Sequence, residues 1–159
     1  MNSVKIDLDN DCPEQWVPSI AAMETWLDTA SRHLSVADKP QSLSVRVIGE
    51  QDSAQLNSQY RGRDKPTNVL SFTCQLPAAV VENLDCVPLG DLAICAPLVE
   101  SEADQQGKTR ESHWAHLLTH GYLHLNGFVH DTPEQAESME ALEISVLEEL
   151  GFPNPYLLN

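Results

Sequence analysis

Two hydrophobic periodicities alternate along the first part of the chain. Residues 4–8 alternate between apolar and polar types, as expected for a half-buried strand, and apolar positions then recur at helical spacing after Pro13. The apolar residues with this spacing are Val17, Ile20, Ala21, Met23, Trp26, Leu27 and Ala30. Residues 42–48 alternate again, and residues 52–60 have the pattern of a short helix that ends near Gly62. The sequence therefore predicts two successive strand–helix units.

Strand patterns in the middle of the chain precede helical patterns in its second half. Residues 68–73 and 89–95 have strand composition, and we expect them to pair as a hairpin across a mobile loop at 75–88. Helical spacing then continues through three segments, residues 97–105, 109–126 and 133–150. The pattern predicts an α+β fold in which helices cover a small mixed β-sheet and the C-terminal half is rich in helix.

The last predicted helix has the clearest boundaries. Thr132 is a capping residue, Pro133 stands at the first helical position, Gln135 follows the cap by three residues, and Gly151 follows the end. No repeat, low-complexity tract or linker divides the 159 residues, a length typical of one ordinary domain. We therefore expect a single domain over residues 1–159.

The charge of the chain limits where nucleic acid can bind. Nine basic residues against 24 acidic ones give a formal net charge of −15, which repels nucleic acid over much of the surface. Arg61, Arg63 and Lys65 form a basic cluster in this acid-rich sequence. Any contact with nucleic acid must therefore be local.

Cysteine usage and hydropathy are typical of a cytoplasmic protein. No stretch approaches the roughly 20 apolar residues that cross a bilayer, and the first residues lack the pattern of a secretory signal. We therefore expect a cytoplasmic protein with no membrane partner. The four scattered cysteines are expected to be reduced thiols, mostly packed as small apolar groups: Cys12, Cys74, Cys86 and Cys95.

Five of the six histidines lie between residues 113 and 130. On a helix, His120 and His124 are separated by about 6 Å of rise and about 40° of rotation, so both rings can reach one ion from the same face. His116 continues this row but lies about 12 Å from His124 along a straight helix, too far to share an ion with it. His113 also lacks converging geometry, so a third ligand must come from a chain that turns back.

Gly127 is suited to make that turn, because a glycine readily adopts the left-handed conformation that ends a helix. His130 can then return toward His120 and His124, which gives the pattern His-x3-His-x2-Gly-x2-His. Three neutral nitrogen ligands leave a fourth position open for water, as in catalytic zinc sites. The alternative is that these imidazoles are core or surface residues without a ligand role, which would require three coordinated placements to coincide.

Metzincin proteases share this spacing, but they carry a glutamate base directly after the first histidine. Here that position is Gly121. Without the carboxylate a peptidase has no proton acceptor. The sequence thus favours a metal-dependent hydrolase other than a metzincin protease.

Residues 120–130 closely resemble the signature of the YbeY family of bacterial metal-dependent endoribonucleases. Further segments are similar to other characteristic parts of that family, in the same order and at comparable spacing: residues 60–72, 89–95, 139–143 and 151–156. The resemblance covers most of the chain from about Tyr60 onward. It implies the compact α+β fold of the family, one zinc ion on His120, His124 and His130, and Arg61 as a functionally important arginine.

The resemblance also implies a function. Members of the family are single-strand-specific endoribonucleases that act on precursor ribosomal RNA, in maturation of the 3′ end of the small-subunit RNA and in ribosome quality control. The implied partners are small ribosomal subunit proteins and a ribosome-assembly GTPase. In such a site zinc (or another divalent metal) activates water, and the Arg61 guanidinium stabilises charge on the phosphate. The general base stays open, as does the choice between hydroxide and the ribose 2′-hydroxyl as the attacking group.

One residue departs from the family pattern. Members usually have an aspartate immediately before the third histidine, where this chain has Val129, with Asp131 on the other side. Carboxylates behind ligating imidazoles can change metal affinity by roughly 10 to 100-fold. We expect weaker metal binding unless Asp131 provides the carboxylate behind His130.

Two other functions are compatible with the sequence. The first is an assembly factor that docks on small-subunit ribosomal proteins with little catalysis of its own, for which an acidic surface is suited. The second is a metal-dependent hydrolase of some other ester or amide, because three histidines alone do not select the substrate. Cleavage of small esters without cleavage of RNA would indicate the other hydrolase. Ribosome maturation that continues when RNA cleavage is lost would indicate the assembly factor.

Overall fold

Four strands form one mixed sheet within residues 3–34 and 39–157, the part of the chain that the computed structural model describes. The strands are β1 (Val4–Asn10), β2 (Gln41–Ile48), β3 (Val69–Thr73) and β4 (Val87–Cys95). Their order is β1-β2-β4-β3, with β1 and β4 parallel to β2 and β3 antiparallel to β4. The predicted hairpin of β3 and β4 is confirmed.

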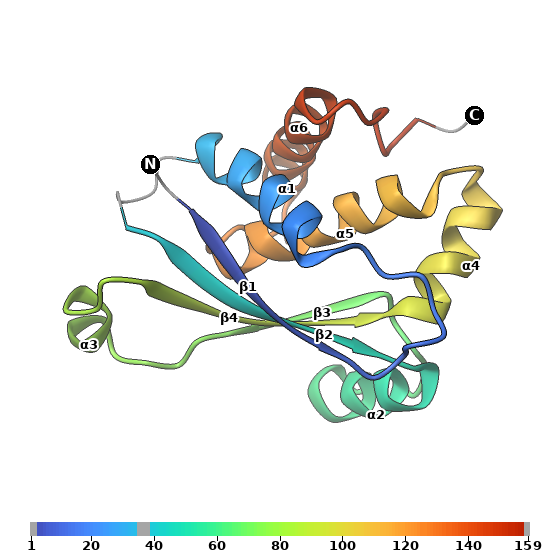
Figure 1. Cartoon of the computed structure of the whole chain (residues 1–159), viewed down its shortest axis with the longest axis horizontal. Coiled ribbons are helices and arrows are strands. Elements are labelled where there is room, and N and C mark those ends of the chain that lie inside the picture. The colour runs from blue at the N-terminus through green and yellow to red at the C-terminus, as the bar shows by residue number, and fades with distance from the viewer. Residues whose placement is uncertain (1–2, 35–38, 158–159) are drawn as a thin grey trace.

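Helices connect and cover this sheet. They are α1 (Ile20–Arg32), α2 (Glu50–Arg61), α3 (Ala78–Glu82), α4 (Ala96–Gln106), α5 (Arg110–Leu125) and α6 (Pro133–Glu149). Figure 1 shows α1 and α5 over one face of the sheet with α6 above them, while α2 lies beneath the opposite face. The α+β architecture predicted from the hydrophobic pattern is therefore confirmed.

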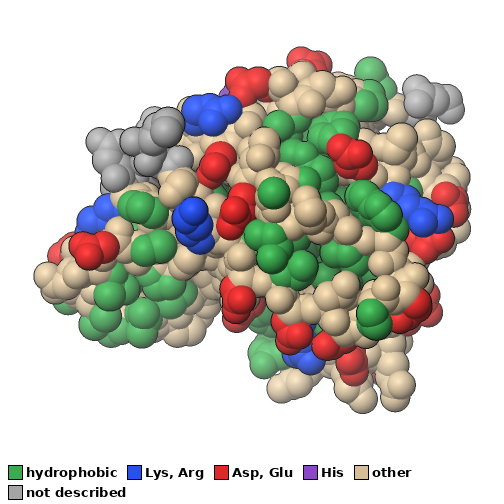
Figure 2. Space-filling model, viewed as in Figure 1, with side chains coloured by type: hydrophobic (Ala, Val, Ile, Leu, Met, Phe, Trp, Pro, Cys, Tyr) green, Lys and Arg blue, Asp and Glu red, His purple; other side chains and the backbone are tan. Residues whose placement is uncertain are grey.

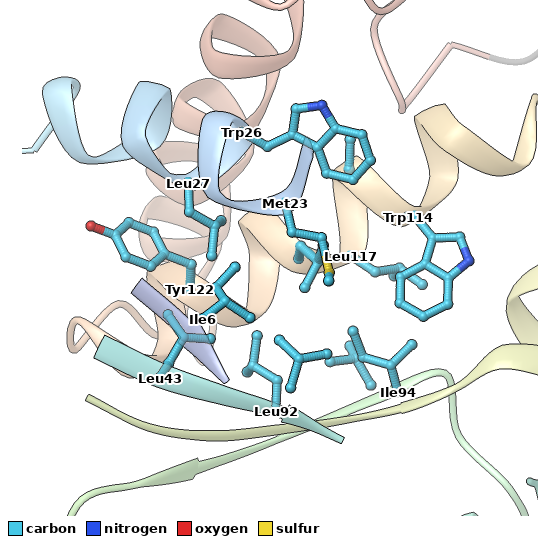
Figure 3. Packing of buried hydrophobic residues seen from close by; sticks show 14 of the residues in the cluster. Ile6, Met23, Trp26, Leu27, Leu43, Leu92, Ile94, Trp114, Leu117 and Tyr122 are labelled. Atoms are coloured by element: carbon cyan, nitrogen blue, oxygen red, sulfur yellow. The ribbon is translucent and has the colours of Figure 1, made fainter. Parts of the chain in front are cut away.

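The main core lies between the sheet and the layer formed by α1 and α5. Figure 3 shows the sheet side chains and the side chains of both helices meeting in this layer. The labelled members are Ile6, Leu43, Leu92 and Ile94 from the sheet, Met23, Trp26 and Leu27 from α1, and Trp114, Leu117 and Tyr122 from α5. The alternating residues of β1 explain its part in the core, because Val4 and Ile6 are buried while Lys5 and Asp7 are exposed.

Two predicted boundaries are wrong. The first helix begins at Ile20 with Ser19 as its cap, well after Pro13, because Pro18 disfavours a helical backbone at Val17. The predicted loop at 75–88 contains the short helix α3, whose turn is closed by hydrogen bonds from the amides of Val80 and Val81 to the Pro77 carbonyl. A single turn is too short to produce a helical hydrophobic period.

The other predicted features are present. Thr132 and Gln135 form the complete capping box of α6, and Thr109 caps α5 by accepting from the amide of Ser112. All four cysteines are free thiols, and Cys12 and Cys95 are buried. No helix in the described part of the chain combines the length and the apolar character needed to cross a membrane.

The surface has apolar side chains in several places, one of them over α3. Figure 2 shows acidic side chains spread over this face of the molecule, with apolar ones at its centre and over α3 at its left edge. Leu76 and Val80 in this region are 47% and 45% exposed. The visible distribution agrees with the acidic composition.

Replacing Leu27 by alanine tests the packing of α1. The Leu27 side chain is 0% exposed, so Leu27→Ala is expected to lower the free energy of unfolding by about 2–5 kcal/mol. Ile20 on the same helix is 42% exposed, and Ile20→Ala is expected to change it by about 0.5 kcal/mol or less. Urea denaturation of both variants measures the difference, and equal losses would contradict the assignment of these two faces.

Candidate metal centre

Helix α5 is buried on nearly all sides. From Ser112 to Leu125 every residue is buried except one row with a spacing of four, formed by His116, His120 and His124. A helix that is buried all round must be held by neighbours on each side, and α5 contacts α1, α4, α6 and the sheet. The partly accessible row of the helix is therefore the histidine row.

His120 and His124 face each other as helical spacing predicts. Their ring centroids are 4.5 Å apart, and their Nε2 atoms are 3.0 Å apart. Both side chains are half-buried. The two nitrogens are placed to bind one ion from the same side of α5.

Gly121 allows α5 to approach the sheet closely. It is buried, and a Cβ atom at this position would lie 2.7 Å from Cδ2 of Leu92 on β4. Position 121 therefore faces the core and not the histidines. A glutamate base of the metzincin kind has no room at this position, which agrees with the exclusion of that protease class.

The chain turns back after α5 as predicted. Gly127 has a φ of +95°, its amide donates to the His124 carbonyl at 3.0 Å, and the Phe128 amide donates to the Leu123 carbonyl at 3.1 Å. This turn brings His130 beside the pair on α5, with ring centroids 5.6 Å from His120 and 5.0 Å from His124. His130 is exposed.

The three histidines fit a divalent metal. One ligand nitrogen from each of His120, His124 and His130 lies within 4.8 Å of the other two. Ligands at about 2.0–2.1 Å from a tetrahedral zinc are roughly 3.3 Å apart, so small side-chain rotations suffice to close the group around an ion. The group, called the histidine trio below, can hold a metal ion.

The Nε2 atom of His124 is available as a ligand. Its Nδ1 lies 2.9 Å from the Phe128 carbonyl, which only accepts hydrogen bonds, so Nδ1 carries the proton and Nε2 carries the lone pair. Burial lowers the pKa of His124, and the charges of His120 and Arg61 lower it further. The ring is therefore neutral at pH 7, as metal binding requires.

A buried carboxylate lies on the other side of the trio. Glu143 on α6 is 1% exposed, and its Oε1 lies 2.7 Å from Nε2 of His116, 2.9 Å from the Tyr156 hydroxyl and 3.4 Å from Nδ1 of His120. Burial by itself would raise the pKa of Glu143, but the hydrogen bond from His116 and the nearby ring of His120 outweigh it and lower this pKa to about 2. The carboxylate is ionised.

The sequence pattern does not single out Glu143 as a site residue. A signal is nonetheless present, because Glu143 shares the buried side of α6 with Met139, Val146 and Leu147 at helical spacing. A glutamate among apolar residues of that spacing indicates a paired, buried carboxylate. The groups that pair with this carboxylate can be identified only from the packing of α6 against α5.

The remaining histidines of this region have other partners. Nε2 of His113 lies 2.9 Å from Oε1 of Glu102 on α4, and Nε2 of His116 bonds Glu143. Neither belongs to the trio, in agreement with the helix geometry argued from the sequence.

Arg61 lies in the same cavity as the trio. This cavity of about 270 Å³ is lined by Arg61, the three histidines, Asn68, Ser71 and Tyr156, among others. A second cavity of about 440 Å³ is lined by Arg61, Arg63 and Lys65, so Arg61 borders both. Arg61 is exposed in the last turn of α2. The fold thus brings the basic cluster next to the histidines.

His130 has no carboxylate partner among the described residues. Val129 is 42% exposed, and Asp131 is exposed, with its amide donating to the Gln135 side chain. Within the described residues no hydrogen bond or ion pair joins the Asp131 carboxylate to His130. Asp131 does not replace the aspartate of the family pattern in this structure.

Comparisons with known proteins assign the chain to a family. A family model described as Endoribonuclease YbeY matches residues 10–151. A relative named Endoribonuclease YbeY from Coxiella burnetii is 44% identical over 153 residues, which cover 96% of this chain and 98% of the relative. Another of that name, from Halorhodospira halophila, is 47% identical over 139 residues, covering 87% and 88%.

A solved structure supports the same fold. The solution structure of a Thermotoga maritima protein matches with a TM-score of 0.54 at 22% identity, covering 93% of this chain and 91% of that one. At this identity the likeness concerns the fold alone. The family match and the two relatives decide the assignment: the chain belongs to the YbeY family of endoribonucleases.

Proposed function

We propose that this protein is a zinc-dependent endoribonuclease that holds one ion on His120, His124 and His130 and cleaves single-stranded ribosomal RNA precursors. The observation that carries the proposal is the convergence of three imidazoles beside Arg61 in one cavity. The relatives are named endoribonucleases, which supports RNA as the substrate. Another divalent metal in place of zinc would leave the assignment of the ligands unchanged.

The donor set favours a catalytic ion. Three neutral nitrogens satisfy three of the four positions of zinc and leave one open, whereas structural zinc sites are closed by four protein ligands. When bound, such an ion acts as a Lewis acid and makes a coordinated water more acidic. The Phe128 carbonyl holds the proton of His124 on Nδ1 and so leaves Nε2 for the ion, and the close approach at Gly121 keeps the row of α5 histidines facing the cavity.

Arg61 is the proposed catalytic residue. Its guanidinium is permanently charged and presents a planar fork that matches two phosphate oxygens, so it suits the stabilisation of charge on a scissile phosphate. Arg63 and Lys65 line the adjoining cavity together with Arg61, which supports a role in binding the RNA backbone. This local positive charge offsets the repulsion between RNA and the net charge of −15.

The proposed setting is maturation of small-subunit ribosomal RNA in the cytoplasm, with small-subunit proteins and a ribosome-assembly GTPase as partners. The acidic surface supports docking against basic ribosomal proteins. The same observation favours a second candidate function, an assembly factor on the small subunit with little catalysis of its own.

Removing one ligand tests the metal and the reaction together. His124→Ala is expected to reduce the metal content from about one equivalent to near zero, and cleavage of a precursor ribosomal RNA by at least about 100-fold. His33→Ala is the control, because His33 lies at the end of α1 and contacts Glu149 instead of the trio. Metal analysis and a gel assay of RNA cleavage provide both readouts. Full cleavage by the His124 variant would sink the proposal.

Replacing Arg61 tests whether stabilisation of charge on the phosphate is independent of metal binding. Arg61→Lys keeps a positive charge but removes the planar fork, so cleavage is expected to fall by about 10²–10³-fold while the metal content stays unchanged. Arg46→Lys on β2 is the matched control, since Arg46 pairs with Asp11 at 3.5 Å and does not line the cavity of the trio. Loss of metal from the Arg61 variant would contradict the separation of roles.

The Arg61 variant also separates the two candidate functions. If cells that depend on Arg61→Lys mature their small-subunit RNA normally although the variant does not cleave RNA in vitro, the assembly factor is favoured. Accumulation of unprocessed precursor in those cells supports the nuclease.

A further inference from the structure

The carboxylate of Glu143 is sealed from solvent directly behind the first histidine of the trio. It is 1% exposed, so it does not reach a substrate in the cavity and acts only through its neighbours. Those neighbours are the Nε2 atom of His116, the hydroxyl of Tyr156 and the Nδ1 atom of His120, at 2.7, 2.9 and 3.4 Å from Oε1. One oxygen thus faces three donors.

The second carboxylate oxygen can also accept a hydrogen bond from one of these donors. Oε2 of Glu143 is buried and has no hydrogen-bond partner among the residues that the structure describes. A carboxylate has about four lone-pair sites, so both oxygens can accept. The 3.4 Å separation from His120 exceeds an ordinary hydrogen bond, and a small rotation of the carboxylate or the ring brings an oxygen into bonding distance while His116 and Tyr156 keep theirs.

A contact of this kind decides which nitrogen of His120 can bind a metal. Nε2 of His120 lies 3.0 Å from Nε2 of His124, whose lone pair accepts a hydrogen bond from it when no metal is bound, so metal binding moves the His120 proton to Nδ1. An ionised carboxylate only accepts, so Glu143 can accept a hydrogen bond from that Nδ1–H and leave Nε2 to the ion. The Phe128 carbonyl does the same for His124. Both α5 histidines then aim their Nε2 atoms into the trio.

We propose that Glu143 is the positioning residue of His120, fixing the ring and its tautomer for metal binding. This inference rests on the proposed metal function. Among the described residues, Glu143 is the carboxylate that makes an ion-pair contact with a member of the trio, whereas Val129 and Asp131 supply none. Support for the ligands therefore comes from α6, across the helix interface, and not from the turn before His130.

The substitution Glu143→Gln tests this role with little change in shape. The amide keeps one accepting oxygen for His116 and Tyr156 but turns an NH₂ donor toward His120, which favours the tautomer with the proton on Nε2. Affinity for Zn²⁺, measured by competition with a chromophoric chelator, is expected to fall by about 10 to 100-fold. Unchanged affinity in a folded variant would overturn the proposal.

Two further variants separate positioning from structural support. Glu102→Gln removes the charge from another carboxylate that bonds a histidine of α5, His113, without contacting the trio, so it is expected to keep the Zn²⁺ affinity within about threefold. Tyr156→Phe removes a donor from the same oxygen of Glu143 and leaves His120 in place. A loss of affinity in Tyr156→Phe equal to that in Glu143→Gln would mean that Glu143 merely anchors the C-terminal segment, which overturns the proposal.

The Nδ1 proton of His120 gives a readout that the wild type alone can provide. In the zinc-loaded protein, imidazole ¹⁵N–¹H correlation spectra are expected to show a His120 Nδ1–H signal that is protected from exchange with water, because Glu143 accepts its hydrogen bond. A zinc-loaded wild type whose His120 Nδ1–H exchanges freely would overturn the inference even if Glu143→Gln does not fold. A wild-type protein that binds no zinc would instead count against the proposed function, so the two failures are distinguishable.

Discussion

The close packing of α5 against the sheet at Gly121 is the constraint on which the site depends. With no side chain at this position, the helix lies against Leu92 of β4, where a Cβ atom would come within 2.7 Å. That contact sets the rotation of the helix about its axis. Because the rest of α5 from Ser112 onward is buried, the rotation decides that His120 and His124 stay open to the cavity. Packing in the core therefore determines that histidine side chains of α5 line the cavity.

The charges around the trio are arranged in layers. Three imidazoles and the exposed Arg61 face the cavity, while the ionised Glu143 is sealed behind His116 and His120. A carboxylate placed in the cavity would repel a phosphate, but one buried behind the ligands supports them without meeting the substrate. The arrangement gives an acidic protein of net charge −15 a local site that suits an RNA backbone.

Several chain segments build this site, and each meets the others through packing. Helix α5 supplies two histidines, the turn at Gly127 supplies the third, the end of α2 supplies Arg61, and α6 supplies Glu143. The capping box at Thr132 starts α6 directly after the turn, so the turn and α6 are coupled along the chain. Displacement of α6 would thus disturb both His130 and the support of His120.

The sequence alone determined the features that depend on residues near one another in the chain. The spacing of His120 and His124, the turn at Gly127 and the cap at Thr132 are local, because helix geometry and backbone preference act over a few residues. Arg61 was linked to the histidines only through family resemblance. Their shared cavity exists because the end of α2 and the histidine row of α5 meet at the edge strand β3, whose residues Val69 and Ser71 also line it. Only the tertiary structure decided that Glu143 lies behind His120, since its partner is set by the docking of α6 on α5, which no local pattern encodes.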